Sequence, residues 1–289
     1  MRDPRQALSS VNVLGSVIAA GALVAVFLGF GNELALAQAA DSVSDVFTGV
    51  LLAWAARTAE APPDDEHPLG HARAESIAAL VVAVLAGVLA TEVVRAAIVA
   101  LLGGERASFE WPVAAAFAGK VVFKLAIANA ATRLARARPS PVLDALRVDA
   151  RNDAVVGTVA LIGFALARAG LPVVDPILAV GVAIYVGLSS LRLARESVML
   201  LLGTSASPLR RAQLEAIVSG TPHVLGVAKL MAVHHGPSLH VEVDVLVDAS
   251  LTLGAAHDVA HAIEEHLGRE SDVAHVVVHV TPAVASGDA

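Results

Sequence analysis

The sequence predicts an α-helical polytopic membrane protein with six transmembrane helices, followed by a small α/β domain on the cytoplasmic side. Of its 289 residues, 56% are hydrophobic and only 16% are charged, and the mean hydropathy is +0.70; an average soluble domain has about 25% charged residues. After residue 204 the long apolar stretches give way to short helical and alternating patterns. We therefore expect a transmembrane domain over 1–204, a cytoplasmic domain over 205–283 and a disordered tail over 284–289.

Six segments of the first part are long and apolar enough to be membrane helices, since a helix needs roughly 20 residues to cross a hydrocarbon core of about 30 Å. They cover 8–30, 34–56, 77–102, 112–134, 142–166 and 174–193. The first segment is too long for the apolar part of a signal peptide, and no clear small-residue cleavage site follows it. The second and fifth segments are less apolar because each contains a pair of aspartates.

Arginines mark one side of the predicted bundle. The loops and segment ends on this side contain Arg2, Arg5, Arg57, Arg73, Arg133, Arg136, Arg138, Arg192 and Arg195. The opposite loops hold little more than Arg106 and Arg168. Because short cytoplasmic loops are enriched in lysine and arginine, we expect both termini on the cytoplasmic side.

The last part of the chain alternates between helical and strand-like patterns. Residues 209–219 and 255–267 have the spacing of helices, whereas 240–245 alternate polar with apolar residues, as a half-buried strand does. Residues 275–280 indicate a closing strand. These patterns predict an α/β sandwich.

Two pairs of aspartates lie inside predicted membrane helices. Asp41 and Asp45 are four residues apart in the second segment. Asp149 and Asp153 are four residues apart in the fifth, so each pair occupies one face of its helix. An ionised carboxylate at the centre of a membrane helix costs at least about 2.5 kcal/mol. Four of them therefore require protons or a cation, and a divalent metal ion supplies the missing charge.

Other charged residues of the predicted helices offer an alternative to a metal. The aspartates could face a water-filled vestibule or pair with Lys120 and Lys124 of the fourth segment. We expect these lysines, with Glu92 and Arg95 of the third segment, to pair with one another and to extend toward the membrane interfaces. Intramembrane charges can also form a proton path.

The connection between the second and third segments contains Asp64, His67 and His71. The chain has no cysteine, so a metal ion can be held only by oxygen or by imidazole nitrogen. Two imidazoles four residues apart, with carboxylates upstream, could complete a metal site. By spacing alone, a solvated acidic loop explains this segment equally well.

Three motifs occur in a characteristic order: Ala40-Asp41-Ser42-Val43-Ser44-Asp45, then Gly70-His71-Ala72-Arg73-Ala74-Glu75-Ser76, then Ala145-Leu146-Arg147-Val148-Asp149-Ala150-Arg151-Asn152-Asp153. In order and spacing they resemble the motifs of the cation diffusion facilitator family. The resemblance covers nearly the whole chain. It implies a secondary transporter in the inner membrane of a bacterial cell, with a cytoplasmic αββαβ domain that is similar to a metallochaperone and forms a homodimer.

The resemblance also implies which residues bind metal. The transport site falls on Asp41, Asp45, Asp149 and Asp153, and the loop site on Asp64, His67 and His71. Zinc-selective members typically have histidine where this chain has Asp149. Imidazole suits zinc, whereas an all-carboxylate site suits harder ions. We therefore expect efflux of Mn²⁺, with Fe²⁺ next, in exchange for protons; efflux of zinc, cobalt or cadmium by the same fold is the alternative.

In the cytoplasmic domain, the resemblance assigns metal ligands to Asp244, His257 and His279. Lys229 stands near where a further histidine is often found, and Thr281 stands where an aspartate often follows the last histidine. We therefore do not expect a full binuclear zinc site. Some members also join their membrane halves through an ion pair; here Arg73 fits its basic partner, but Gly203 occupies the acidic position.

Two other classes of protein compete with a transporter. An intramembrane aspartyl protease also needs aspartates on two helices, but two pairs exceed its need and the GxGD context is missing, so we expect no enzyme. A non-transporting membrane metal sensor, in which the C-terminal histidines act, remains an alternative. No basic, aromatic-interleaved patch indicates nucleic acid. The expected partners are divalent metal ions, protons, the lipid bilayer and a second copy of the chain, without an organic cofactor.

Overall fold

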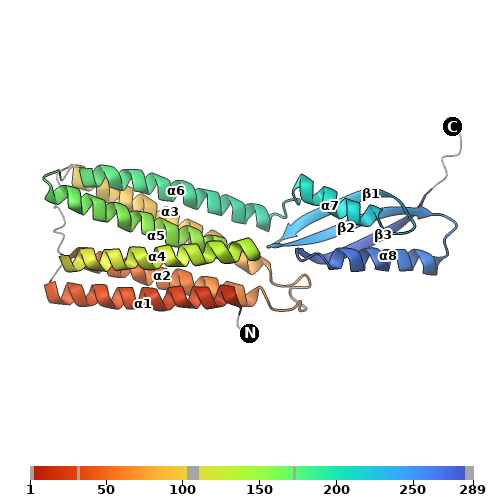
Figure 1. The fold of residues 1–289 in the computed structure, drawn as a ribbon, viewed down its shortest axis with the longest axis horizontal. Coiled ribbons are helices and arrows are strands. Elements are labelled where there is room, and N and C mark those ends of the chain that lie inside the picture. Colours follow the sequence, from red (N-terminus) through yellow and green to blue (C-terminus); the bar gives the residue numbers. More distant parts are fainter. Residues whose placement is uncertain (1–2, 31–32, 103–110, 172–173, 284–289) are drawn as a thin grey trace. The chain divides into compact units, whose positions relative to one another are not determined.

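The computed structural model describes residues 3–30, 33–102, 111–171 and 174–283, which belong to two compact units, Met1–Val198 and Met199–Ala289. Ahead of the second unit, the described residues form six long helices (Figure 1). These are α1 Pro4–Phe30, α2 Glu33–Thr58, α3 Arg73–Leu101, α4 Trp111–Ala137, α5 Pro141–Arg168 and α6 Val174–Leu201. They coincide with the six predicted segments. The tail expected over 284–289 lies outside the described residues.

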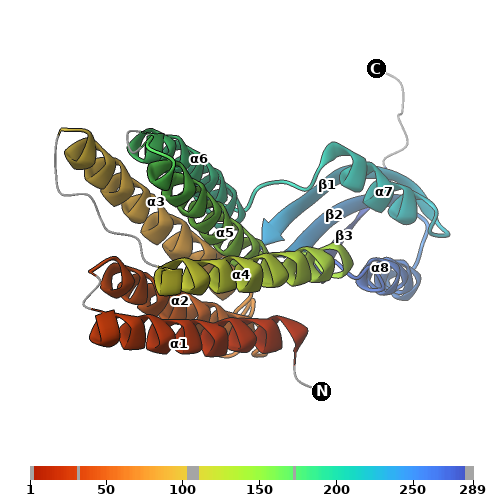
Figure 2. The same cartoon turned by 60° about the vertical axis from the view of Figure 1, so that its left-hand side comes forward.

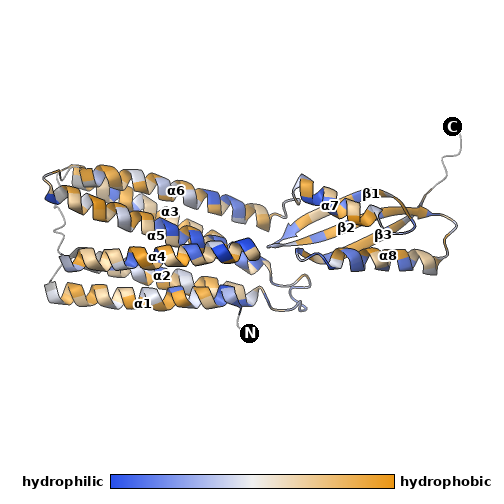
Figure 3. Cartoon of the chain, in the orientation of Figure 1, coloured by the Kyte–Doolittle hydropathy of each residue, from blue (hydrophilic) through white to orange (hydrophobic). Residues whose placement is uncertain are grey.

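The surface of the helical unit is largely apolar. Among the described helices, α1, α3, α4 and α6 are long and apolar enough to cross a membrane by length and composition. Large apolar side chains point outward, with Leu14, Leu28, Val122 and Leu188 exposed by 62–77%. Figure 3 shows apolar residues along the helices. A water-soluble bundle would bury many of these side chains, whereas lipid solvates them.

Small residues bring the helices close together. The principal core of the unit consists mainly of alanines from α2 to α5, with leucines and valines such as Leu52, Val82 and Leu146. Gly49 of α2 lies against Val13 of α1, and Gly157 of α5 against Val121 of α4, in each case too close for an added Cβ. Small residues at such crossings allow two helix backbones to approach. As a result α1 packs on α2 and α4 packs on α5, as Figures 1 and 2 show.

The second unit has the order helix, two strands, helix, strand, as predicted. Its elements are α7 Pro208–Ser219, β1 Val224–His235, β2 Ser238–Asp248, α8 Leu253–Gly268 and β3 Val273–Ala283. Both helices have an N-cap residue with a hydroxyl group. The Ser207 hydroxyl accepts a hydrogen bond from the backbone N–H of Arg210, and the Thr252 hydroxyl accepts one from the backbone N–H of Ala255. In the sheet β1 and β2 are antiparallel, while β2 and β3 are parallel and joined through α8.

The two faces of this sheet differ. Val241, Val243 and Val245 of β2 are buried and share a core with Leu214 of α7 and Ile263 of α8. Because successive side chains of a strand point to opposite faces, the residues between these valines point to the other face. That face presents mainly polar side chains: His240 is paired in register with His275 and Asp244 with His279, while Glu242 lies beside the exposed Val277.

Candidate metal centre

Three aspartates of the two predicted pairs meet between the helices. Asp45 of α2 and Asp149 and Asp153 of α5 each offer a carboxylate oxygen, and these oxygens all lie within 4.8 Å of one another. Asp45 is buried, and its side chain is only 6% exposed. The spacing of four residues on α5 turns Asp149 and Asp153 to one face, toward α2. The result is a compact cluster of oxygen ligands, which we call the three-carboxylate cluster.

Two lysines of α4 lie in this region. Lys124 Nζ is 2.6 Å from a carboxylate oxygen of Asp153, 3.1 Å from Asp45 and 3.8 Å from Asp149. Its side chain is 1% exposed, which makes it one of the most completely buried large side chains among the described residues. Lys124 thus contacts every member of the three-carboxylate cluster.

Asp41, the fourth predicted ligand, is outside this cluster. Its carboxylate pairs with Lys120 Nζ at 2.5 Å, and the same ammonium group lies 3.2 Å from Asp45. Lys120 and Lys124 are four residues apart on α4, so both ammonium groups reach the aspartates from one helix face.

The expectation that these lysines extend toward the membrane interfaces is wrong. Their flexible four-carbon stems could reach an interface, but both ammonium groups instead pair with carboxylates of α2 and α5. The expected pairing of Glu92 with Arg95 is confirmed, at 2.8 Å on the exposed surface of α3.

Asn152, which precedes Asp153, is turned toward another helix. Its side-chain oxygen accepts a hydrogen bond from the Ser189 hydroxyl of α6 at 2.9 Å, and the residue is buried. Asn152 therefore ties α5 to α6 and fixes the rotation of the helix that carries two of the three clustered aspartates.

The loop between α2 and α3 brings Asp64, His67 and His71 together, with one ligand atom of each within 4.8 Å of the others. Asp64 accepts hydrogen bonds from the backbone N–H of His67 at 2.6 Å and of Glu66 at 3.1 Å. The backbone hydrogen bond from His67 and, to a smaller extent, the nearby imidazoles of His71 and His67 hold the pKa of Asp64 below its ordinary value. Each imidazole has a nitrogen 3.3 Å from an Asp64 oxygen. The loop can thus offer one ionised carboxylate and two nitrogens to an ion.

The candidates of the second unit are only partly brought together. Asp244 and His279 are register partners on β2 and β3. Lys229 is 3.4 Å from Glu242, and Thr281 donates to Asp244 at 2.7 Å, so a cation and a hydroxyl stand where further ligands were considered. His257 lies on α8, which packs on the opposite face of the sheet, and its ring stacks with that of His261. Within one chain, His257 therefore does not join Asp244 and His279.

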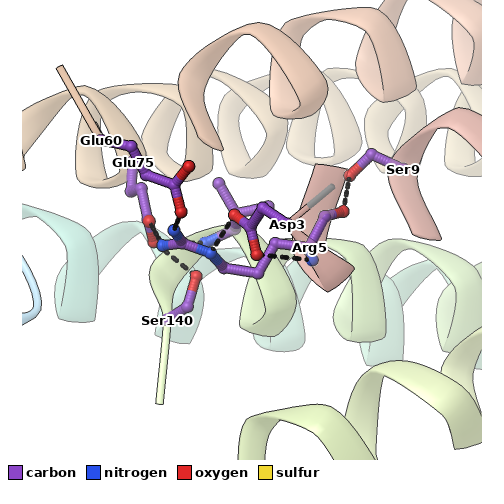
Figure 4. Close-up of polar contacts among 7 residues, drawn as sticks. Asp3, Arg5, Ser9, Glu60, Glu75 and Ser140 are labelled. Carbon is purple, nitrogen blue, oxygen red and sulfur yellow. Dashed lines mark hydrogen bonds and ion pairs between the residues drawn. The ribbon is translucent and has the colours of Figure 1, made fainter. Parts of the chain in front are cut away.

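A buried ion cluster at the ends of α1, α3 and α5 has no counterpart in the sequence-based predictions (Figure 4). The Arg5 guanidinium pairs with Glu75, with Glu60 at 2.7 Å and with Asp3 at 2.7 Å. Glu75 is fully buried and accepts from the Ser140 hydroxyl just before α5. The sequence alone indicates a loop charge at Arg5 and a motif residue at Glu75; no periodicity signals that two residues so far apart in the chain form a pair.

The position of Gly203 has a local explanation. Its φ of 75° lies in the left-handed region that favours glycine. The N–H of Gly203 bonds to the carbonyl of Leu200, and that of Thr204 bonds to the carbonyl of Met199, which terminates α6. This backbone conformation favours glycine and accounts for Gly203 at the position where the resemblance would place the acidic partner of Arg73.

A bundle of apolar helices that encloses clustered carboxylates, continued by an αββαβ unit, defines a membrane protein that binds cations. Residues 9–202 match the family described as the cation efflux transmembrane domain, and residues 206–283 match the cytoplasmic domain of cation efflux proteins. The chain therefore belongs to the cation efflux family of membrane transporters.

Several characterised and uncharacterised relatives are similar over nearly their whole length. The uncharacterized transporter YdbO of Bacillus subtilis is 29% identical, covering 94% of this chain and 93% of that protein. The manganese efflux system protein MneP of the same organism is 27% identical, covering 98% and 99%. The cation-efflux pump FieF of Shewanella oneidensis is 27% identical, covering 87% and 85%. The relatives thus include both a manganese efflux protein and a cation pump.

Proposed function

We propose that the protein exports a divalent metal ion, Mn²⁺ in preference and Fe²⁺ next, from a bacterial cytoplasm in exchange for protons. The observation that carries this proposal is the three-carboxylate cluster of Asp45, Asp149 and Asp153, with Asp41 beside it, between apolar helices. A cluster of negative charge inside a membrane needs cations to be stable, and Lys120 and Lys124 supply only two positive charges for the four aspartates. In a cation efflux protein, the transported ion is the natural candidate.

The preference for manganese follows from the donor atoms. The cluster offers only carboxylate oxygens, which suit manganese and other hard ions, whereas imidazole and thiolate suit zinc. MneP, a relative named for manganese efflux, supports the same choice. FieF is named as a cation-efflux pump without a stated metal; efflux of zinc, cobalt or cadmium by the same fold is the second candidate.

In the proposed mechanism, the carboxylates are open alternately to the two sides of the membrane. Metal ion from the cytoplasm displaces protons from them, and protons from outside displace the metal. The same groups can serve both cations because clustered carboxylates bind protons as a coupled set. Asp64, His67 and His71 are proposed to bind metal ions in the loop, on the cytoplasmic side together with both termini.

The domain over 205–283 is proposed to form the homodimer and to bind metal through Asp244 and His279. In such a dimer a second copy would have to supply His257, because α8 covers the other face of its own sheet. A metal sensor without transport would depend wholly on this domain. Deleting residues from 206 onward should therefore leave residual transport, whereas complete loss with a folded membrane domain would favour the sensor.

Metal-driven proton movement in proteoliposomes tests the transport site. We expect Asp45→Ala and Asp153→Ala each to abolish the change in internal pH that follows addition of Mn²⁺. Glu92→Gln is the matched control, since Glu92 is a carboxylate on a membrane helix but is exposed and paired with Arg95. Unchanged flux in both aspartate variants would overturn the proposed site.

A further inference from the structure

The geometry points to Lys124 as a built-in competitor of the transported ion: its ammonium group occupies the three-carboxylate cluster when metal is absent and must leave when metal binds. This inference rests on the proposed function, because it assumes that Asp45, Asp149 and Asp153 hold the ion. It assigns a role to a residue that is not itself a metal ligand.

The ammonium group of Lys124 lies where a bound metal ion would lie. Lys124 Nζ is 2.6 Å from Asp153, 3.1 Å from Asp45 and 3.8 Å from Asp149, and the carboxylate oxygens themselves lie within 4.8 Å of one another. A divalent ion bound to these oxygens at about 2.0–2.6 Å would stand among the same three groups. Nitrogen and metal cannot both occupy that volume, so binding of one excludes the other.

The charges of Lys124 and of the three carboxylates stabilise each other. An empty cluster of ionised carboxylates inside a membrane is costly, and an isolated buried ammonium group is costly too. Paired, each stabilises the other, so the metal-free protein is stable without a metal ion in the cluster. The incoming ion must displace the ammonium group, which lowers metal affinity; the returning ammonium group helps to expel the ion, which favours release.

Lys120 provides an internal comparison. It lies on the same face of α4 and is less completely buried, with 10% of its side chain exposed. Its shortest contact, however, is with Asp41, outside the three-carboxylate cluster, and it contacts only one cluster member, Asp45. Neutralising Lys120 should therefore affect metal binding less than neutralising Lys124.

The side-chain chemistry of lysine suits this role. Its ammonium group is a compact charge on a flexible stem and can swing away from the cluster while the backbone of α4 stays packed on α5. Arginine would instead bind carboxylates through a planar, bidentate fork that is harder to displace. Methionine has a similar length and flexibility but no charge.

Calorimetric titration of the purified full-length protein with Mn²⁺ tests the inference, after subtraction of the binding that remains in the Asp45→Ala/Asp153→Ala variant. We expect Lys124→Met to lower the Kd of the aspartate-dependent site by about tenfold or more, because a nearby opposing charge is removed. Lys120→Met should lower it less, and Lys124→Arg should raise it. In proteoliposomes Lys124→Met should lower both KM and maximal rate, since metal is then released more slowly.

Two outcomes are decisive in opposite ways. If the wild type shows no aspartate-dependent Mn²⁺ binding, the proposed function itself fails. If the wild type binds Mn²⁺ but Lys124→Met binds it equally or more weakly, only the role of Lys124 is overturned, and the lysine is a structural ion-pair partner.

A second variant covers the case in which Lys124→Met does not fold. Lys124→Ala leaves space for a small free cation, so added methylammonium should raise its Kd for Mn²⁺ while leaving the wild type unaffected. Equal sensitivity of both proteins to methylammonium would refute competition at this position.

Discussion

Under the proposed function, Asp149 is the side chain on which the choice of metal depends. It is one of three carboxylates whose oxygens lie within 4.8 Å of one another, and its carboxylate lies 3.8 Å from the ammonium nitrogen of Lys124. The ammonium nitrogen of Lys124 is closer to Asp153, at 2.6 Å, so Asp149 is held less tightly by this lysine. Another metal-binding side chain could therefore replace Asp149 without loss of the shortest contact of Lys124. An imidazole here would add a nitrogen donor, which zinc prefers to manganese.

Substituting Asp149→His should shift transport from Mn²⁺ toward Zn²⁺, changing the ratio of their kcat/KM values by about tenfold or more. Competition between the two metals during uptake into proteoliposomes measures this ratio. Asp144→His is the matched control, because Asp144 is also an α5 carboxylate but pairs with Arg147 instead of the cluster. An unchanged ratio in Asp149→His would show that this position does not set the preference.

The start of α5 is fixed by a residue of another helix. Glu75 of α3 accepts from the Ser140 hydroxyl and, at 3.5 Å, from the backbone N–H of Val142 in the first turn of α5. The first N–H groups of a helix have no partner inside it, and a carboxylate at that end also interacts favourably with the helix dipole. Together with Arg5, Glu75 thus links α1, α3 and α5, the helix that carries Asp149 and Asp153.

Replacing Glu75 by alanine should destabilise the helical unit by about 1–3 kcal/mol, because it removes a buried partner of Arg5 and of the Ser140 hydroxyl, although Asp3 and Glu60 still contact Arg5. Glu92→Ala removes an equivalent carboxylate from an exposed pair and should cost under about 0.5 kcal/mol. Thermal unfolding of both variants in detergent gives the comparison. Equal melting temperatures would contradict a structural role for Glu75.

The strand β1 contains a histidine that should make its stability depend on pH. Burial lowers the pKa of His234 below its ordinary value of about 6.5, and nearby Asp272 opposes the shift only in part. The unfolded strand therefore takes up a proton at a higher pH than the folded strand. Stability should fall as the pH drops from about 6.5 toward the lower pKa of the folded state.

Hydrogen exchange of β1 amides, corrected for the intrinsic rate at each pH, measures this effect in the full-length protein. We expect protection to decrease between about pH 7 and pH 5.5. In His234→Gln this decrease should be smaller, and the difference between the two proteins isolates His234 from the other histidines. If protection decreases equally in the wild type and in His234→Gln, a group other than His234 causes the pH dependence.

The aspartate pairs could be predicted from the sequence, and the cations that accompany them could not. Spacing of four residues puts Asp149 and Asp153 on one helix face wherever α5 lies. Whether Lys124 meets them depends on how α4 is rotated and on which of several directions its flexible stem takes, and neither is encoded in local periodicity. The same holds for Arg5, which a count of loop charges treats as solvated although it is buried in a network.

The two units of the chain have separate cores, which bears on how the protein assembles. The second unit surrounds buried residues such as Val243, Ile263 and Leu214, contributed by its own strand and helices. Its helices begin with hydroxyl caps, and Arg210 pairs with Asp272 at 2.5 Å and with Glu270 at 2.8 Å, which joins α7 to the segment before β3. A unit that has its own hydrophobic core, capped helices and internal ion pairs can be expected to fold independently.

Residues 199–289 produced alone should therefore fold and, under the proposed function, form a dimer. Circular dichroism and sedimentation measure the two properties. Val243→Asp is the control, because an unpaired charge in this core should prevent folding. If the isolated domain is folded but monomeric at all concentrations, the proposed dimer contact of the intact protein must lie in the helical unit.

Under the proposed function, the two lysines of α4 also bear on the electrical behaviour of the exchange. The four aspartates outnumber Lys120 and Lys124 by two charges. Either one divalent ion or two protons would make up this difference, so an exchange in that ratio moves no net charge through the bilayer. Since each uncompensated charge would exchange about 2.3 kcal/mol with a potential of 100 mV, such a carrier responds to the proton concentration gradient and is indifferent to the membrane voltage.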